Sequence, residues 1–175
     1  MNCVENMIKI IGAKGLISNV DDFLMKISKF AKDNKITIQA FNADVIYDKN
    51  HLISAFEHAK RAMDRKTNTT NSLEMEILLY SSGERQLKLA IPKMGIKKNT
   101  KKIAFILISK KDYISNYLIQ KLLNHLSLRR CDDVLNIDGK NIKKFGINEK
   151  EIKTVSTDNY EKLIIEKVAL VDIIK

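Results

Sequence analysis

The sequence predicts an α+β (mixed α/β) fold, with a small central sheet of short strands flanked by several helices. Short runs of β-branched residues alternate with longer stretches of helical periodicity. The length, 175 residues, is typical of about one domain and is sufficient to bury a core. One proline and 6 glycines leave no Pro- or Gly-rich linker, so we expect residues 1–175 to form a single domain.

The first elements follow from apolar patterning and capping residues. Met7–Ile11 is an apolar run that ends at Gly12, as expected for a strand. Asp21 is expected to cap a helix that continues to about Asn34. One or two strands then follow on these β-branched and small residues: Ile36, Ile38, Ala40, Val45 and Ile46.

A long amphipathic helix is predicted from its cap, Asp48, to Arg65 or Lys66. Its apolar stripe, at helical spacing, is Leu52, Ala55, Phe56, Ala59, Ala62 and Met63. A neighbouring stripe is entirely polar or basic and consists of His51, Ser54, His58, Arg61 and Arg65. This helix therefore has one face for the core and another for solvent or a partner.

The later elements alternate in the same way. We expect helices at Leu73–Tyr80, Glu84–Met94, Tyr113–Leu126 and Asp158–Ile173, a buried strand at Ile103–Ser109, and short helices or turns between Asp138 and Lys153. Ser72 is a plausible cap for the first of these helices, and Ser81–Gly83 breaks it. Pro92 predicts a kink or an early end before the stop at Gly95.

Positive charge is concentrated in one part of the chain. The formal net charge is +10, and no acidic residue lies between Arg85 and Lys111. The cations of this block are Arg85, Lys88, Lys93, Lys97, Lys98, Lys101, Lys102, Lys110 and Lys111. Such a block suits a polyanion, either nucleic acid or an anionic surface. A merely solvated, lysine-rich face is the alternative.

Motifs for catalysis, metals and membranes are missing from the sequence. It contains no phosphate-binding loop, dinucleotide-binding turn or nucleophile elbow. His51 and His58 lie about 10 Å apart along a helix, too far to ligate one zinc ion. We therefore expect no catalysis, metal or cofactor. With no membrane helix, no signal peptide and two distant cysteines, Cys3 and Cys131, a cytoplasmic protein is expected.

Two segments suggest contact with RNA. Ile10–Ile17 looks like the GxxG loop of a KH domain, in which Gly12, Lys14 and Gly15 would meet phosphates. A turn at the end of a strand is the alternative interpretation. At Ser82–Gln86, free backbone N–H groups and Arg85 could converge on a phosphate.

The order and spacing of several short segments resemble one family. They are Ile38–Ala43, His51-Leu52 with Ala55, His58-Ala59 and Arg61-Ala62, Leu73–Tyr80, Ser82–Leu87, Ala90-Ile91 and Gly95-Ile96. The family is the small tRNA-binding regulatory subunit of the KEOPS complex (the Cgi-type, or PRPK-binding protein, family), here in its archaeal form. The resemblance is strongest from about Ile36 to Ile108.

This resemblance implies a non-catalytic function. KEOPS makes threonylcarbamoyladenosine beside the anticodon of tRNA, and a separate metal-containing subunit performs the transfer. The family docks on the N-terminal lobe of the complex's atypical kinase, an ATPase, and captures the 3′ CCA end of tRNA. Rival functions are a free-standing KH-type RNA-binding module and a protein-only scaffold or regulator of a kinase.

The basic helix face and the glycine turn give the expected site residues. We expect the RNA surface to consist of His51, His58, Arg61, Arg65, Ser82, Gly83, Arg85 and Gln86, with Lys97 and Lys98 in support. For the kinase contact we expect Leu163, Val168 and Val171 of the C-terminal helix. Because these three residues are apolar and at helical spacing, the alternative is that they belong to the core.

Overall fold

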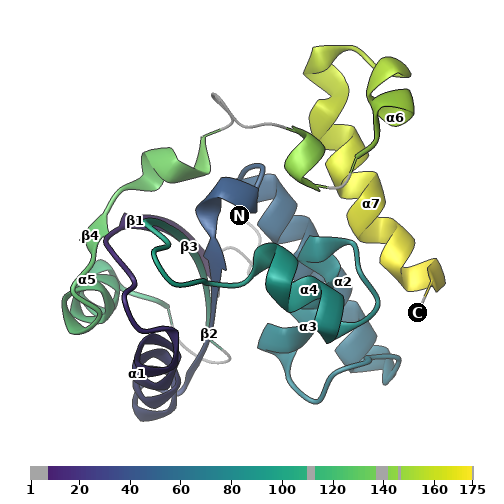
Figure 1. Cartoon of the computed structure of the whole chain (residues 1–175). Helices are drawn as coiled ribbons and strands as arrows, with labels where there is room; N and C mark the ends of the chain where they lie inside the picture. Colours follow the sequence, from purple (N-terminus) through teal and green to yellow (C-terminus); the bar gives the residue numbers. More distant parts are fainter. Residues whose placement is uncertain (1–7, 110–112, 137–141, 146, 175) are drawn as a thin grey trace. The chain divides into compact units, whose positions relative to one another are not determined.

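The computed structural model describes residues 8–109, 113–136, 142–145 and 147–174 (Figure 1). The predicted α+β class is confirmed, since helices accompany an antiparallel sheet in these residues. The chain divides into two compact units, Met1–Ala43 with Ile96–Leu135 and Asp44–Gly95 with Asn136–Lys175. That residues 1–175 form one domain stays a prediction, and each unit is described by itself.

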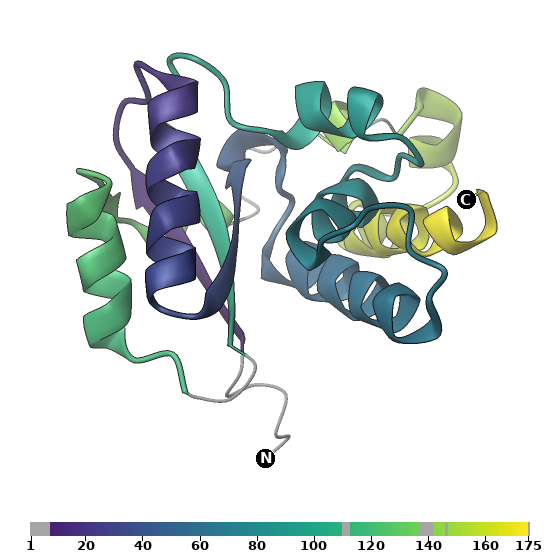
Figure 2. The same ribbon diagram turned by 90° about the horizontal axis from the view of Figure 1, so that it is seen from below.

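In its described residues the first unit is a sheet with two α-helices and the short 3₁₀ helix η2 (Asp132–Leu135). Its antiparallel strands, in the order β2-β3-β1-β4, are β1 (Ile8–Lys14), β2 (Ile36–Asn42), β3 (Lys102–Ser109) and β4 (Arg129–Arg130). Figure 2 shows α1 (Val20–Asp33) and α5 (Asn116–His125) side by side against the strands.

One core joins this sheet to its two helices. Alternate residues of the two central strands face the helices, as the period of a strand requires: Ile11, Ala13, Ile103, Phe105 and Leu107. The helices contribute Phe23, Ile27 and Phe30 from α1 and Ile119, Leu122 and Leu123 from α5. The buried strand expected at Ile103–Ser109 is confirmed as β3.

Two expectations for this part of the chain are wrong. The cap of α1 is Asn19 rather than Asp21, because the backbone N–H of Asp22 donates to the Asn19 side chain at 3.0 Å. Val45 and Ile46 do not form a strand; a short 3₁₀ helix, η1 (Ala43–Val45), follows β2, and Ile46 is buried. The β-branched residues Val45 and Ile46 therefore do not indicate extended backbone here, because such residues also occur where a side chain is buried.

Gly12 lies inside β1 and not in a loop. It pairs with Ala104 of β3, and its N–H donates to the Asp132 carboxylate at 2.8 Å. Its carbonyl accepts from the N–H of Cys131 at 2.9 Å. Since Gly12 and Lys14 both belong to the ladder, the interpretation as a KH-type GxxG loop is wrong. The glycine is needed because the chain at Cys131 passes directly over it.

The second unit is helical in its described residues. Its longer helices are α2 (Lys49–Arg65), α3 (Leu73–Ser82), α4 (Leu87–Met94) and α7 (Tyr160–Ile174). Shorter helices are η3 (Ile142–Phe145), α6 (Glu149–Lys153) and η4 (Thr157–Asn159). α2 packs against both α3 and α7 (Figure 1). The apolar stripe predicted for α2 supplies buried residues to this packing, among them Leu52, Ala55 and Ala59.

Helix ends in this unit follow local chemistry. Asp48 caps α2 as expected, accepting from the N–H of His51 at 2.8 Å. α3 continues through Ser82 and ends at Gly83, whose φ of +68° suits glycine. α4 begins at Leu87 rather than Glu84, because Gln86 is extended. Pro92 lies inside the helix, which continues to Met94 and ends at Gly95 as expected, so the early end predicted from Pro92 is wrong.

The close passage over Gly12 gives a test. A methyl group at Gly12 would lie 2.4 Å from the Cys131 carbonyl oxygen, a backbone atom. At Gly15 it would meet the end of the Leu128 side chain, which can rotate away. We expect Gly12→Ala to destabilise the protein by about 2 kcal/mol and Gly15→Ala by less than about 1 kcal/mol. Urea unfolding followed by circular dichroism measures both, and equal stabilities would contradict the packing described.

Candidate nucleic-acid interface

The polar stripe of α2 is positioned by burial of the apolar stripe beside it. With Leu52, Ala55 and Ala59 in the core, the side chains of Arg61 and Arg65 remain exposed. His58, one turn before Arg61, is half-buried. The predicted basic stripe is therefore a real surface along the second half of α2.

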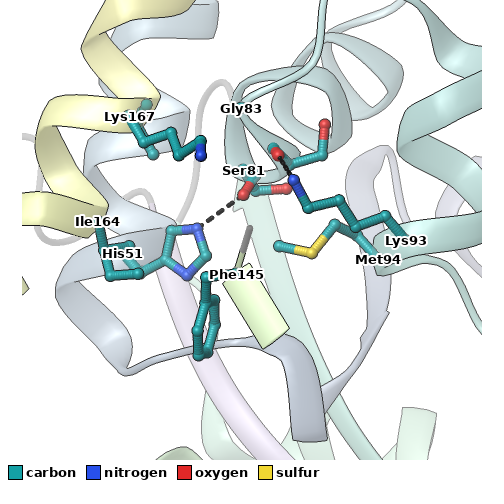
Figure 3. A pocket seen from close by; sticks show the side chains of 10 residues that line it. His51, Ser81, Gly83, Lys93, Met94, Phe145, Ile164 and Lys167 are labelled. Carbon is teal, nitrogen blue, oxygen red and sulfur yellow. Dashed lines mark hydrogen bonds between the residues drawn. The ribbon is translucent and has the colours of Figure 1, made fainter. Parts of the chain in front are cut away.

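His51, at the start of the same stripe, is buried. It is 1% exposed, and both ring nitrogens have partners within the unit. Nδ1 lies 3.2 Å from the backbone N–H of Tyr47, and Nε2 lies 2.8 Å from the carbonyl oxygen of Ser81 (Figure 3). Nδ1 thus accepts and Nε2–H donates, which assigns the neutral tautomer protonated at Nε2. The expectation that His51 lies on an RNA surface is wrong.

Asp172 joins the stripe to the C-terminal helix. His58 Nδ1 lies 2.7 Å from Asp172 Oδ2, and the Tyr80 hydroxyl donates to Oδ1 of the same carboxylate. Arg61 lies 4.0 Å from Oδ2 and 2.9 Å from His58 Nδ1. One nitrogen cannot donate and accept together, so we assign His58 Nδ1–H as the donor to the carboxylate, the stronger charge-assisted bond. Asp172 therefore connects α2, α3 and α7.

The acidity of this cluster reflects its contacts. Partial burial raises the pKa of Asp172, but hydrogen bonds from Tyr80 and His58 and the charges of His58 and Arg61 outweigh it and lower the pKa below its ordinary value. Burial first, and then the bond to Asp172, raise the pKa of Tyr80 well above its ordinary value. The carboxylate is thus the form that the fold stabilises, and it offsets part of the positive charge of the stripe.

The turn between α3 and α4 brings Arg85 to the surface. Ser82 is buried, with its hydroxyl donating to the Leu79 carbonyl at 2.7 Å. Lys93 covers the end of α3, donating to the Ser82 carbonyl at 2.5 Å and to Glu84 at 3.0 Å. Arg85 is exposed, and its guanidinium donates to the Ile174 carbonyl at 3.4 Å. Of this predicted segment, Arg85 and Gln86 remain available to a ligand, whereas the Ser82 side chain is not.

An open groove of about 560 Å³ lies beside Arg85. Its walls are the loop Thr69–Ser72, Met75 of α3 and the start of α4 at Arg85–Lys88. Glu76, fully buried, fixes the loop by accepting from the N–H groups of Thr69 and Thr70 and from the Thr70 hydroxyl, at 2.8 to 3.2 Å. The groove therefore offers two cations, hydroxyls and an apolar thioether in one place.

The cavity around His51 is too small for a ligand. It is lined by His51, Ser81, Ser82, Gly83, Lys93, Met94, Phe145, Ile164, Lys167 and Val168 (Figure 3). Its volume of about 10 Å³ is that of a single water molecule. It is a gap in the packing that surrounds the end of α3.

The remaining predicted residues are divided between the two units. Lys97 and Lys98 are exposed in the turn before β3, in the first unit. Val168 and Val171 are 1% and 0% exposed, so the expectation that they form a docking surface is wrong and the core alternative holds. Leu163 is half-buried against the cluster around Phe145.

Sequence reasoning did not find Asp172, Tyr80 or the groove. Asp172 lies 92 residues from Tyr80, and nothing local links them. The signal for the loop was the run of hydroxyl and amide residues at 67–71, followed by an acidic residue in the first turn of the next helix. Across the described ranges no cluster of His, Cys, Asp or Glu could hold a metal ion. In the same ranges no helix is both long and apolar enough to span a membrane.

The lowered pKa of Asp172 predicts how stability depends on pH. A lowered carboxyl pKa contributes stability above its ordinary value of 3.8, and that contribution is lost as pH falls through the folded-state pKa. Asp172→Asn should therefore cost about 1 kcal/mol at neutral pH, allowing for partial exposure, and progressively less toward about pH 3. Thermal melting from neutral to acid pH measures this difference.

Asp64→Asn is the matched control for this prediction. Asp64 lies 2.8 Å from Lys60, and both side chains are more than half exposed. Such a surface ion pair contributes little to stability, so the control should have the melting temperature of the wild type at every pH. Two results would contradict the cluster described. One is equal stability of Asp172→Asn and wild type at neutral pH, and the other is a stability difference that does not decrease in acid.

Comparison with protein families gives one match. The model of the kinase binding protein CGI-121 family matches residues 16–172. No curated protein is similar enough in sequence to count as a relative. The match covers α1, the sheet after β1 and the helices that carry the basic stripe, the groove and Asp172. The chain therefore belongs to the CGI-121 family of kinase-binding proteins.

Proposed function

We propose that this protein is the tRNA-holding subunit of a KEOPS complex, which captures the 3′ CCA end of tRNA and docks on the complex's kinase. The observation that carries the tRNA part is the groove beside Arg85 in the second unit. A second support is the exposed stripe of Arg61 and Arg65 on α2. In this proposal the chain supplies no reacting group, and another subunit makes threonylcarbamoyladenosine.

The groove has the chemistry that a single-stranded RNA end requires. Arg85 and Lys88 are exposed cations at its edge, suited to phosphates. The hydroxyl groups of Thr69 and Ser72 and the amide of Asn71 can bond to base edges and ribose. None of the described residues that line it is aromatic, so Met75 and Leu87 would contact the bases instead. Affinity would come mainly from phosphates and would fall with salt.

The kinase partner follows from the family, and the exposed part of α7 is the proposed contact. Leu170, Ile173 and Ile174 are exposed apolar side chains at helical spacing in its last turns. Because residues three and four positions apart share a helix face, these side chains form one apolar patch, and such a patch is typical of an interaction site. Leu163, expected from the sequence to contribute, stays a prediction, as does the cytoplasmic location.

Arg85 is the residue that tests tRNA capture most directly. Arg85→Glu replaces a phosphate contact by repulsion, so we expect tRNA affinity to fall about tenfold or more. The slope of log affinity against log salt concentration should become less steep by about 1. Lys162→Glu makes the same charge change on exposed α7 and should leave binding nearly unchanged. Fluorescence anisotropy with labelled tRNA measures both, after melting curves confirm folding. Wild-type affinity in Arg85→Glu would reject this assignment.

The two sides of α7 give a paired test of kinase docking. Ile173→Glu should leave the fold intact and abolish binding to the KEOPS kinase subunit, because Ile173 is exposed. Val171→Glu should unfold the protein, at a cost of more than about 3 kcal/mol, because its side chain is fully buried. Calorimetric titration with the kinase and thermal melting distinguish them. If Ile173→Glu binds like wild type whereas Leu163→Glu does not, the contact lies at Leu163 instead.

A protein-only regulator of a kinase remains the second candidate. It is favoured by the family, which is defined by kinase binding. It differs from our proposal in one measurable property, because such a protein would bind tRNA no better than any polyanion of equal length.

A further inference from the structure

A buried carboxylate lies behind one wall of the groove. Glu76, in the first turn of α3, is 0% exposed, and the residues that follow it, Ile77 and Leu78, belong to the core. Both carboxylate oxygens accept from the loop. The backbone nitrogen of Thr69 lies 3.2 Å from each of them, and that of Thr70 lies 2.9 Å from Oε2. The loop that forms this wall is therefore attached to α3 from its inner side.

Thr70 is the centre of this attachment and is itself buried. Its hydroxyl has one hydrogen and two acceptors within reach, Glu76 Oε2 at 2.8 Å and the Ser72 carbonyl at 3.0 Å. We assign the hydrogen to the carboxylate, since a charge-assisted hydrogen bond is the stronger one. The Thr70 carbonyl accepts from the side-chain amide of Asn68 at 2.9 Å. The polar groups of Thr70 are thus used within the loop.

The other polar side chains of the loop differ from Thr70 in this respect. In the part of the chain that the structure describes, the side chains of Thr69, Asn71 and Ser72 form no hydrogen bond, and all three line the groove. Ser72 is the N-cap of α3, where a serine hydroxyl commonly accepts from the helix, yet it makes no such bond. The position of the loop therefore decides where these donors and acceptors meet a ligand.

Stability alone does not account for a carboxylate at this place. The free energy lost when a charged group leaves water offsets much of what its hydrogen bonds return, so a buried carboxylate is weak evidence for stabilisation. What Glu76 supplies is one fixed arrangement of the Thr69 and Thr70 N–H groups. A wall fixed in advance does not have to be ordered when a ligand binds, and this increases affinity.

We propose that Glu76 is a positioning residue of the RNA groove, which determines selectivity for a single-stranded 3′ end without touching the RNA. The inference rests on the proposed function, because it takes the groove as the site of that end. Arg85 and Lys88 of the same groove suit the phosphates of any RNA. The loop that Glu76 positions is the part that distinguishes the unpaired end from the rest of the molecule.

The test uses variants that loosen the loop and leave every cation in place. Glu76→Gln keeps the size of the side chain but replaces an acceptor oxygen by a donor. Thr70→Val removes the hydroxyl bond, and Thr70→Ser keeps it. The control is Thr67→Val, because the Thr67 hydroxyl bonds to the Ala62 carbonyl at 3.5 Å and not to Glu76. Melting curves establish folding, and if Glu76→Gln does not fold, Thr70→Val decides the test.

Two quantities are measured for each variant. One is the ratio of affinities for tRNA with its 3′ CCA intact and removed, and the other is hydrogen exchange of the Thr69 and Thr70 amides by NMR without RNA. We expect Glu76→Gln and Thr70→Val to lower the ratio about fivefold, with binding of trimmed tRNA and its salt dependence nearly unchanged. Exchange of both amides should be about fivefold faster or more. Thr70→Ser should restore most of the ratio, and the control should match the wild type.

A purely structural role gives a different result. It would weaken binding of intact and trimmed tRNA equally, and that outcome in a folded variant would overturn the proposal. Wild-type ratios in folded Glu76→Gln and Thr70→Val, or unchanged exchange of the two amides, would overturn it as well. If the wild type itself binds both forms of tRNA equally, the proposed function is rejected and this inference with it, whereas a preference that persists in the variants rejects this inference alone.

Discussion

The imidazole of His51 holds together the part of the second unit on which the proposed function depends. It accepts from the Tyr47 N–H just before α2 and donates to the Ser81 carbonyl at the end of α3. With the apolar stripe of α2 buried beside it, this bridge fixes the start of one helix against the end of another. The exposed stripe of α2 and the turn that presents Arg85 are consequently held in one arrangement. A polar group so deeply buried is tolerated because both of its nitrogens are satisfied.

The positive charges of one segment of the chain are distributed over both units. The acid-free block that the sequence revealed is divided, with Arg85, Lys88 and Lys93 in the second unit and Lys97 to Lys102 in the first. Lys93 is used structurally, at the end of α3. Asp172 offsets part of the charge on α2. The exposed cations of this segment therefore lie on both units, with Arg85 and Lys88 beside the groove of the second unit and Lys97 and Lys98 on the first.

Local patterns predicted the elements well because helices and strands obey periodicities that need no distant partner. The cap at Asp48 and the stop at Gly83 were predictable for this reason. Asn19 and Asp21 are both good capping residues two positions apart, so residue type could not choose between them. Apolar residues occur on every side of α7, among charged ones, and its spacing therefore could not separate buried Val171 from exposed Ile173. His51 lies on the polar stripe by angle, and only its partner 30 residues away shows why it is buried.

The most direct test of the central claim is a salt titration of wild-type protein with one tRNA, with its 3′ CCA intact or removed. The groove beside Arg85 should bind the single-stranded end, so trimming should weaken binding strongly at every salt concentration. The residual binding of trimmed tRNA should keep a steep salt dependence, as phosphate contacts require. Equal affinity for both forms would contradict end capture and leave kinase binding as the function that the family supports.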